Sequence, residues 1–533
     1  MKTGQIWNAD LENGNYKNPI LYADYSDPDA IRVGEDYFMI ASSFSNTPGL
    51  PLLHSKDLIN WKLVNYIIDE IPESRYKNSM HGCGVWAPSI RYHNGTYFVC
   101  FPMPDEGIYM STATNPFGKW SKPVNIRPGA GWIDPCPFWD EDGKAYLVAG
   151  VAKSRIGYKS VLHMVEMQPD GMGLIGEEKK IFDGNENDQV TIEGPKMYKR
   201  NGWYYVFAPA GGVKIGWQTV LRSRNVFGPY EYKVVMRQGT SPINGPHQGA
   251  WVDTATGEDW FIHFQDVYAA GRITHLQPMS WKEDWPIIGI AKDGSDYGEP
   301  VIEYKKPNVG NVNWEICEPV TSDDFSGTEL GLQWQWNANA KKEWYDLTGN
   351  GLKLNAIHKT SVYGDMPNLL LAKWPAPEFT CITKLNLANL TDGDEAGIIS
   401  MGMQYGLLSF KKEGAELLPS YISGIQHYGK ILPDSTEETA VALPTIACSQ
   451  AEELYVKYSV ICTGKRDLNE KETGFPLELV TIAYSTDGST YQKAGEMAAI
   501  PGRWVGVKNG IFCASEKAES NGFIIVEYVN YSR

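Results

Sequence analysis

The sequence predicts an all-β protein in which a five-bladed β-propeller is followed by a β-sandwich of the jelly-roll or concanavalin-like type. Two observations predict the propeller: a segment pattern recurs five times, and no helical period of any length interrupts its short strands. A third observation predicts the sandwich, because after about residue 322 the strands alternate without the earlier segment starts. We expect the propeller over residues 15–305 and the sandwich over residues 320–533.

Each repeat opens where a polar or aromatic residue precedes Pro or Gly, and it continues as an apolar run, a turn and an aromatic-rich strand. Successive starts lie about 47 to 60 residues apart, which is the spacing of propeller blades. Every repeat has room for about four strands, so five repeats fit five four-stranded blades around one axis. A β-sandwich is the competing all-β prediction, but it does not explain so long a repeat. The starts are Asp27, Ala87, Asp134, Glu193 and Gln248.

The pattern ends between residues 290 and 322, where polar turn residues predict a linker. Short alternating strands then follow, such as residues 379–383 and 523–529, with turns such as Thr391-Asp392-Gly393 between them. About 210 residues of this kind suffice for a second domain.

Composition and charge exclude several classes of partner. The net charge is −16, from 48 basic and 64 acidic residues, and no basic stripe predicts nucleic acid binding. No stretch of about 18 apolar residues predicts a membrane-spanning helix. Residues 1–14 carry one Lys and no apolar core of a secretory signal, so we expect a cytoplasmic protein, although a trimmed leader would give the same sequence.

Three of the five starts carry an acid, namely Asp27, Asp134 and Glu193. The first strand of each blade should line the central channel, so equivalent positions converge on the axis. Carboxylates that share a funnel of low dielectric constant cannot all ionise at the same pH, so their pKa values should spread. A spread of pKa values supplies the acid and the base that glycoside hydrolysis needs. The alternative is that Asp-Pro and Glu-Gly-Pro are turn chemistry, which accounts for one start more easily than for three matched starts.

These segment starts resemble those of glycoside hydrolase family 43. The stretch after residue 321, with Asp323-Asp324-Phe325 and Trp334-Gln335-Trp336, resembles the C-terminal sandwich of the family's β-xylosidases. The resemblance therefore covers the whole chain. The segments that carry it in the first half are Asn18-Pro19-Ile20-Leu21, Ser26-Asp27-Pro28-Asp29, Val85-Trp86-Ala87-Pro88, Ile133-Asp134-Pro135 and Ile192-Glu193-Gly194-Pro195.

The resemblance implies an enzyme that inverts the anomeric centre, with Asp27 as general base and Glu193 as general acid. Asp134 would hold Glu193 and raise its pKa. Inversion needs room for a water molecule, so we expect the carboxyl groups of Asp27 and Glu193 to be roughly 6.5–9.5 Å apart. A related retaining clan carries Asn-Asp-Pro-Asn and Glu-Cys motifs, and Gly194-Pro195 after the Glu argues against it.

Four further residues are candidates for binding roles. Trp86 would stack on a sugar, Phe44 would wall the pocket, and Arg272 resembles an Arg that holds pentose hydroxyls in the family's xylosidases. His247 resembles the axial His that helps to hold a calcium ion, largely through water, in many members. The alternatives are a core Trp, a core Phe, a surface Arg and a hydrogen-bonded core His.

The sequence therefore predicts an exo-acting glycosidase that releases terminal β-D-xylosyl or α-L-arabinofuranosyl units from plant cell-wall oligosaccharides. An endo-arabinanase with an open cleft is the alternative enzyme. A non-catalytic carbohydrate-binding propeller and a scaffold for protein partners are the alternatives from other classes, and assembly into a homo-oligomer stays open. We expect the sandwich to close the pocket with a loop. The aromatic cluster Trp334, Trp336, Trp344 and Tyr345 is a candidate for the domain contact or for the sandwich core.

Overall fold

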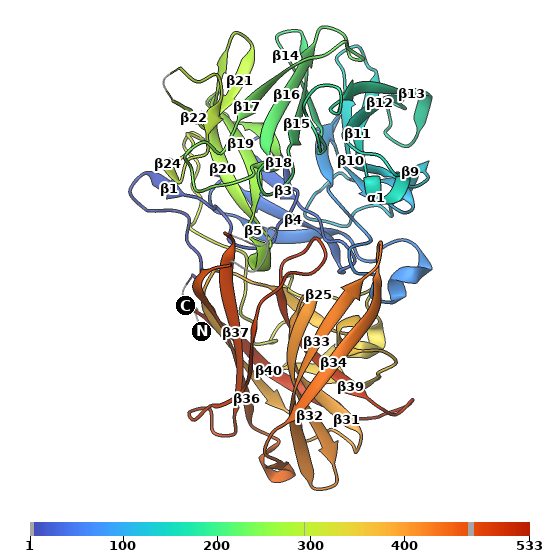
Figure 1. The fold of residues 1–533 in the computed structure, drawn as a ribbon, viewed down its shortest axis with the longest axis vertical. Coiled ribbons are helices and arrows are strands. Elements are labelled where there is room, and N and C mark those ends of the chain that lie inside the picture. The colour runs from blue at the N-terminus through green and yellow to red at the C-terminus, as the bar shows by residue number, and fades with distance from the viewer. Residues whose placement is uncertain (1–4, 293, 467–473) are drawn as a thin grey trace.

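The computed structural model describes residues 5–292, 294–466 and 474–533 and has two all-β domains stacked along the long axis (Figure 1). The upper domain in the view is a five-bladed propeller and the lower domain is a concanavalin-like sandwich, which confirms the predicted fold class. The helices of this part of the chain are single turns, such as α1 (Lys153–Ile156) and the 3-10 helix η2 (Tyr268–Ala270), and none is long and apolar enough to cross a membrane.

Each blade is an antiparallel sheet whose four strands follow one another along the chain. The first two blades contain β2 (Asp29–Val33), β3 (Asp36–Ile40), β4 (Gly49–Ser55), β5 (Lys62–Ile68), and β6 (Ser89–His93), β7 (Thr96–Met103), β8 (Gly107–Ala113), β9 (Val124–Pro128). The third contains β10 (Trp132–Trp139), β11 (Ala145–Val151), β12 (Val161–Met167) and β13 (Leu174–Asp183). The last two contain β14 (Lys196–Arg200), β15 (Trp203–Ala210), β16 (Trp217–Ser223), β17 (Glu231–Met236), and β18 (His247–Asp253), β19 (Asp259–Asp266), β20 (Arg272–Lys282), β21 (Trp285–Ile288).

The aromatic-rich second strand of a blade supplies the contacts that join neighbouring blades. Successive side chains of a strand point to opposite faces of its sheet, so one strand can serve two interfaces. On β3, Phe38 packs toward Val99 of the second blade, whereas Tyr37 and Met39 pack toward Ile262 of the fifth. Similar apolar clusters fill the other blade interfaces of the described chain. The aromatic pattern of the repeats is therefore the pattern of the propeller core.

Short strands complete the propeller at its edge. β1 (Asn15–Lys17) pairs with β24 (Glu303–Lys305), and β22 (Ile290–Ala291) and β23 (Gly298–Glu299) extend the fourth blade. The Asn18 side chain donates a hydrogen bond of 2.7 Å to the carbonyl of Leu276 on β20. The N-terminal segment is thereby fixed along the fifth blade and leads directly into β2 of the first.

Two sheets form the sandwich. One contains, in spatial order, β25 (Gln335–Trp336), β29 (Leu370–Lys373), β39 (Lys508–Ser515), β31 (Asp394–Met401), β32 (Gln404–Glu413), β33 (Glu416–Tyr428) and β34 (Pro433–Ala442), with β28 (Ile357–His358) and β35 (Ile446–Ala447) beside it. The other contains β26 (Tyr345–Leu347), β27 (Leu352–Asn355), β40 (Phe523–Ser532), β30 (Phe379–Asn386), β36 (Leu454–Lys465), β37 (Pro476–Ser485) and β38 (Gln492–Ala498).

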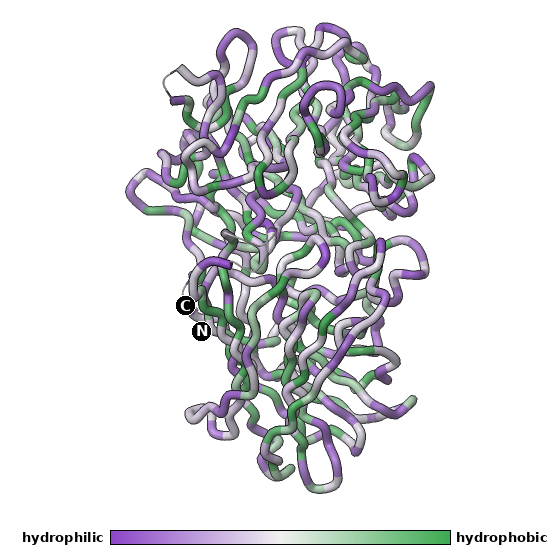
Figure 2. The backbone as a smooth tube through the Cα atoms, viewed as in Figure 1, coloured by the Kyte–Doolittle hydropathy of each residue, from purple (hydrophilic) through white to green (hydrophobic). Residues whose placement is uncertain are grey.

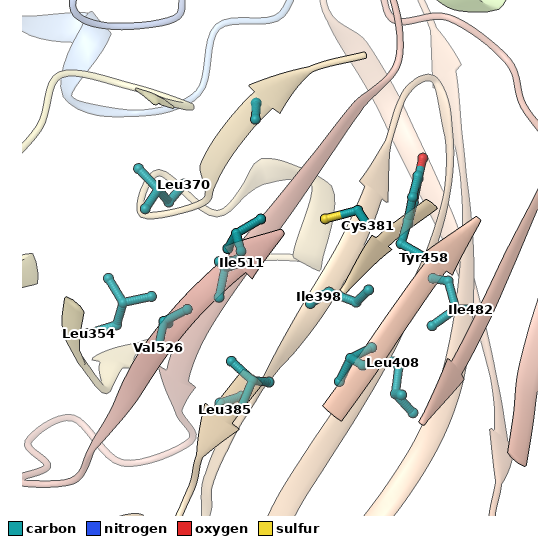
Figure 3. Packing of buried hydrophobic residues seen from close by; sticks show 14 of the residues in the cluster. Leu354, Leu370, Cys381, Leu385, Ile398, Leu408, Tyr458, Ile482, Ile511 and Val526 are labelled. Atoms are coloured by element: carbon teal, nitrogen blue, oxygen red, sulfur yellow. The ribbon is translucent and has the colours of Figure 1, made fainter. Parts of the chain in front are cut away.

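Alternating apolar side chains of the two sheets meet in the sandwich core. Leu385 and Val526 come from one sheet, and Ile398 and Ile511 from the other, and all four are buried in one cluster (Figure 3). Hydrophobic segments accordingly alternate with hydrophilic ones along the tube of Figure 2. The core of the sandwich extends into the propeller, because Ala269 and Ala270 of η2 belong to the same cluster.

The two domains are joined by backbone hydrogen bonds as well as by apolar packing. Thr47 of the propeller and Trp336 of β25 exchange N–H···O=C bonds of 3.0 and 2.6 Å. The Asn339 side chain likewise bonds the backbone of Ile71, at 2.8 and 2.9 Å. Trp334, Trp336 and Trp344 are buried in the sandwich cluster, and Trp336 alone among these three makes the bridge to Thr47. The aromatic cluster therefore belongs to the sandwich core and, through Trp336, also contributes to the contact between the domains.

This interface predicts that the propeller does not function alone. A chain of residues 1–310 exposes the apolar surface around η2 and leaves Thr47 without its backbone partner, so we expect an insoluble or nearly inactive product. Solubility on expression and hydrolysis of small aryl pentosides measure the outcome, with the full chain as control. A soluble fragment of full activity would show that the sandwich is an accessory module.

Candidate active site

The acidic starts of the inner strands have an unusual backbone. Asp27 and Asp134 have φ angles of 55° and 56°, in the left-handed region that non-glycine residues seldom occupy, and Gln248 has 38°. The pairing of β10 with β11 shifts between Ile133 and Cys136, and that of β18 with β19 shifts between His247 and Gly249. Such bulges re-aim side chains at the end of a strand. Here the residues at the two register shifts, Ile133, Asp134, His247 and Gln248, all line one pocket.

The three acids meet in one pocket with a cavity volume of about 90 Å³. Asp27, Asp134 and Glu193 all line it, as do the sequence candidates Phe44, Trp86, His247 and Arg272. The structure therefore brings every candidate site residue to a single place. The remaining lining residues are Ala87, Ile133, Val213, Gln248 and Trp504.

Both oxygens of the Asp27 carboxyl are held. Nη1 of Arg272 donates to Oδ1 at 2.8 Å, and the Ser42 hydroxyl donates to Oδ2 at 2.6 Å. Burial disfavours the charged form of Arg272, but the charges of Asp27, Asp266 and Asp24 outweigh burial and raise its pKa. Arg272 is 9% exposed, so the alternative of a surface Arg is wrong. Asp27 is thus fixed in orientation while its oxygens keep lone pairs for a further donor.

Glu193 is the most accessible of the three acids. Its side chain is 26% exposed, and Oε1 lies 2.9 Å from Nε2 of His247. His247 is almost fully buried and packs edge-on against Phe264, with ring centroids 5.7 Å apart. The hydrogen bond to the buried His247 ring fixes the orientation of the Glu193 carboxyl, while its partial exposure lets it contact a substrate.

Asp134 lies behind Glu193 and is 2% exposed. Its Oδ2 accepts hydrogen bonds from the backbone N–H of Gly194, at 2.8 Å, and from the Gln248 amide, at 3.3 Å. Burial, followed by the charges of Glu193 and Asp27, raises the pKa of Asp134 to about 8. Burial and like charge act on Asp134 together, and both favour its protonated form.

Aromatic side chains wall the pocket. Phe44 contacts Trp86 at a centroid distance of 6.0 Å, and its backbone pairs with Val85. Trp86 also contacts Trp504 at 6.2 Å, edge to face. Trp504 belongs to the sandwich, in the loop between β38 and β39, so this is the loop that the sandwich contributes to the pocket.

Sequence reasoning missed Trp504 and Ser42, and it identified Gln248 only as the start of the fifth repeat. A signal for Trp504 does exist, because Gly502-Arg503-Trp504-Val505-Gly506 places a large aromatic residue between glycines in a loop. Trp504 is 44% exposed, which is high for a tryptophan within a folded domain. Ser42 is an ordinary polar residue in the sequence, and only the folded chain brings it to Asp27. The repeat places Gln248 with the other starts but does not indicate its hydrogen bond to Asp134.

His247 could supply one ring nitrogen to a calcium site. Its Nδ1 is buried and has no hydrogen-bond partner, so one ring nitrogen remains for a cation or a water molecule. The described part of the chain contains no group of three or more ligand side chains that could hold a metal ion. Calcium prefers six to eight oxygen ligands, so water would have to supply most of them. The calcium site stays a prediction.

The comparisons with known proteins cover both domains. The model of glycosyl hydrolases family 43 matches residues 16–286, and that of the beta xylosidase C-terminal concanavalin A-like domain matches residues 322–532. A putative beta-xylosidase of Xylanibacter ruminicola is 37% identical, over 94% of this chain and 87% of its own. The non-reducing end alpha-L-arabinofuranosidase BoGH43B of Bacteroides ovatus is 31% identical, over 74% and 75%.

Among solved structures, the bifunctional GH43-CE protein of Bacteroides eggerthii superposes with a TM-score of 0.80 at 26% identity. The superposition covers 97% of this chain and 63% of that one, so the chain spans less than two thirds of this larger relative. The fold, the acidic pocket and the matched models together define a glycosidase. The chain belongs to glycosyl hydrolases family 43.

The raised pKa of Asp134 predicts a pH dependence of stability. The folded protein keeps this proton up to about pH 8, whereas an unfolded Asp releases it near pH 4. The contribution to stability is therefore complete below about pH 4 and is lost as the pH rises through 8. Asp134→Asn removes this loss, so we expect the variant to melt a few degrees above the wild type at pH 8–9 but not at pH 5, with reduced activity.

Melting temperatures of both proteins from pH 5 to pH 9 check the prediction. Asp394→Asn is a matched control, because Asp394 is fully buried in the sandwich and accepts hydrogen bonds from Thr391 and Ser520. A difference between Asp134→Asn and wild type that is the same at every pH would contradict the raised pKa.

Proposed function

We propose that the protein is an exo-acting, inverting glycosidase that releases terminal β-D-xylosyl or α-L-arabinofuranosyl units from plant cell-wall oligosaccharides. The observation that carries the proposal is the meeting of Asp27, Asp134 and Glu193, from three different blades, in one pocket with Arg272 and Trp504. Family membership supports the reaction type, and the names of the relatives support the two sugars.

Asp27 acts as the general base in this proposal. It takes a proton from the water molecule that attacks the anomeric carbon, on the face opposite the leaving group. Arg272 and Ser42 fix the direction of its oxygens, and Arg272 has further donors on its guanidinium for sugar hydroxyls. Since the base is held by charged and neutral donors, attack requires no reorientation of Asp27.

Glu193 acts as the general acid and gives its proton to the departing glycosidic oxygen. Its partial exposure lets it reach that oxygen, and His247 holds it from behind. Asp134 is the positioning residue of the pair: it bonds the backbone N–H of Gly194, the residue that follows the acid.

The closed wall supports exo-action. An endo-acting enzyme needs a groove that lets a chain pass on both sides of the cleaved bond, whereas Trp504 stands against Trp86 at the pocket rim. The wall supports a pocket that takes the end of a chain. An endo-arabinanase is therefore the less favoured enzyme.

Hydrolysis of p-nitrophenyl β-D-xyloside and α-L-arabinofuranoside, measured side by side, tests the proposal. We expect release of p-nitrophenol from at least one of them, and α-xylose as the first anomer seen by NMR when the xyloside is cleaved. The β-anomer first would show a retaining mechanism. A folded protein without activity on either substrate would support the non-catalytic carbohydrate-binding propeller.

Variants of the two acids separate their roles. Asp27→Ala and Glu193→Ala should each lower kcat/KM by about 10²–10⁴-fold. The loss for Glu193→Ala should shrink on aryl glycosides with good leaving groups, which need little protonation, whereas the loss for Asp27→Ala should not. Asp140→Ala is a matched control, because Asp140 is a buried acid at the opposite end of β10 and pairs with Lys199. Equal losses for Glu193→Ala on all leaving groups would remove it from the acid role.

A further inference from the structure

Asp24 is a buried acid that contacts both domains. It lies three residues before Asp27, is 5% exposed, and has no counterpart among the segment starts. Its Oδ1 accepts a hydrogen bond of 3.0 Å from the backbone N–H of Arg272, and its Oδ2 accepts one of 2.9 Å from the backbone N–H of Gly506. One carboxylate thus binds a strand of the propeller and a loop of the sandwich.

Each of these two amides belongs to a segment that builds the pocket. Arg272 begins β20 and its side chain donates to Asp27. Gly506 lies two residues after Trp504 in the loop that leads into β39. The position of Arg272 against the base and the position of Trp504 at the rim therefore share one anchor.

The two segments pack closely around that anchor. The backbone N–H of Val507 donates to the carbonyl of Ala269 at 2.7 Å. A Cβ atom on Gly506 would come within 2.8 Å of the Ala270 carbonyl oxygen, and one on Gly271 within 2.6 Å of Asp24 Oδ1. Such spacing leaves no room for a side chain, so the loop and the strand meet backbone to backbone.

Charge also favours an acid at this position. Lys508 of the sandwich is buried nearby, and Lys373 is half-buried. Loss of hydration lowers the pKa of both, that of Lys508 to about 7, while the charge of Asp24 raises both pKa values. Nζ of Lys508 donates to the side chain of Asn46 of the propeller. A neutral residue in place of Asp24 would remove the charge that raises these two pKa values and would make the charged form of each lysine less stable.

We propose that Asp24 is a positioning residue that holds Trp504 of the sandwich and Arg272 of the propeller in register, so that the sugar pocket is complete only when the domains are docked. The kinetic part of this inference rests on the proposed glycosidase function, whereas the anchoring of the two segments does not.

Three variants of the full-length protein test the proposal. Asp24→Ala removes both acceptors. Asp24→Asn keeps the size but offers one carbonyl oxygen, so it can satisfy only one of the two amides without placing an N–H against the other. Asp10→Ala is the matched control, because Asp10 is a propeller acid of similar burial, 3% exposed, that pairs with Lys306 away from the pocket.

Hydrogen exchange followed by mass spectrometry reads the anchoring without any substrate. We expect faster exchange in peptides that contain Arg272 and Gly506 for Asp24→Ala, in one of the two for Asp24→Asn, and in neither for Asp10→Ala. Unchanged exchange of both peptides in a folded Asp24→Ala protein would overturn the proposal. If Asp24→Ala does not fold, Asp24→Asn decides by the same criterion.

Kinetics on the better aryl pentoside then separate positioning from simple loss of fold. A lower fraction of folded enzyme reduces kcat and leaves KM unchanged, whereas a displaced Trp504 raises KM and a displaced Arg272 lowers kcat. We expect kcat/KM to fall by roughly 10–100-fold in Asp24→Ala, and by clearly less when Trp504→Ala is already present. If the losses of kcat/KM in Asp24→Ala and Trp504→Ala are fully independent, and KM is unchanged in Asp24→Ala, the positioning role is overturned.

A wild type without activity would refute the proposed function, while the exchange experiment would still decide whether Asp24 anchors the two segments.

Discussion

The crowding of three carboxyl groups into one pocket is the constraint on which the rest of the site depends. Three carboxyl groups cannot share a buried pocket unless each has a donor or a proton of its own. Asp27 has Arg272 and Ser42, Glu193 has His247, and Asp134 has two N–H donors and a raised pKa. The backbone bulges and left-handed residues at the strand starts accompany this arrangement, which makes them part of the site rather than irregularities of the sheet.

Much of the fold and most of the candidate residues could be predicted from the sequence because the repeat encodes both. A strand that packs on two neighbouring blades needs apolar residues on both faces, and this need leaves the aromatic pattern that marks each blade. Equivalent starts then converge on the axis, so the repeat alone is enough to place Asp27, Asp134 and Glu193 together. Trp86 and Phe44 were candidates from their places in the first two repeats, and the resemblance to the family added Arg272 and His247, which no periodicity identifies.

The remaining contacts could not be predicted because they join positions far apart in the chain. Trp504 reaches the pocket only through the docking of the second domain, and Asp24 contacts Gly506 across 482 residues. The difference in depth between Asp134 and Glu193 belongs to the same class, since Asp134 is far less exposed. Burial and the charges of Glu193 and Asp27 raise the pKa of Asp134, whereas the effect of Asp134 on Glu193 stays a prediction. Sequence spacing carries no information on such differences in depth.

Because Trp504 comes from the sandwich, two separate parts of the sequence determine the structure of the active site. The propeller supplies the three acids and the groups that donate hydrogen bonds to them. Part of the pocket wall comes from the other domain, from the loop of nine residues, 499–507, that contains Trp504. Substitutions around Trp504 would change the wall of the pocket without replacing any of the three acids. The sugar that fits the pocket can therefore change between relatives while the three acids stay the same, so two proteins with the same acids need not share a substrate.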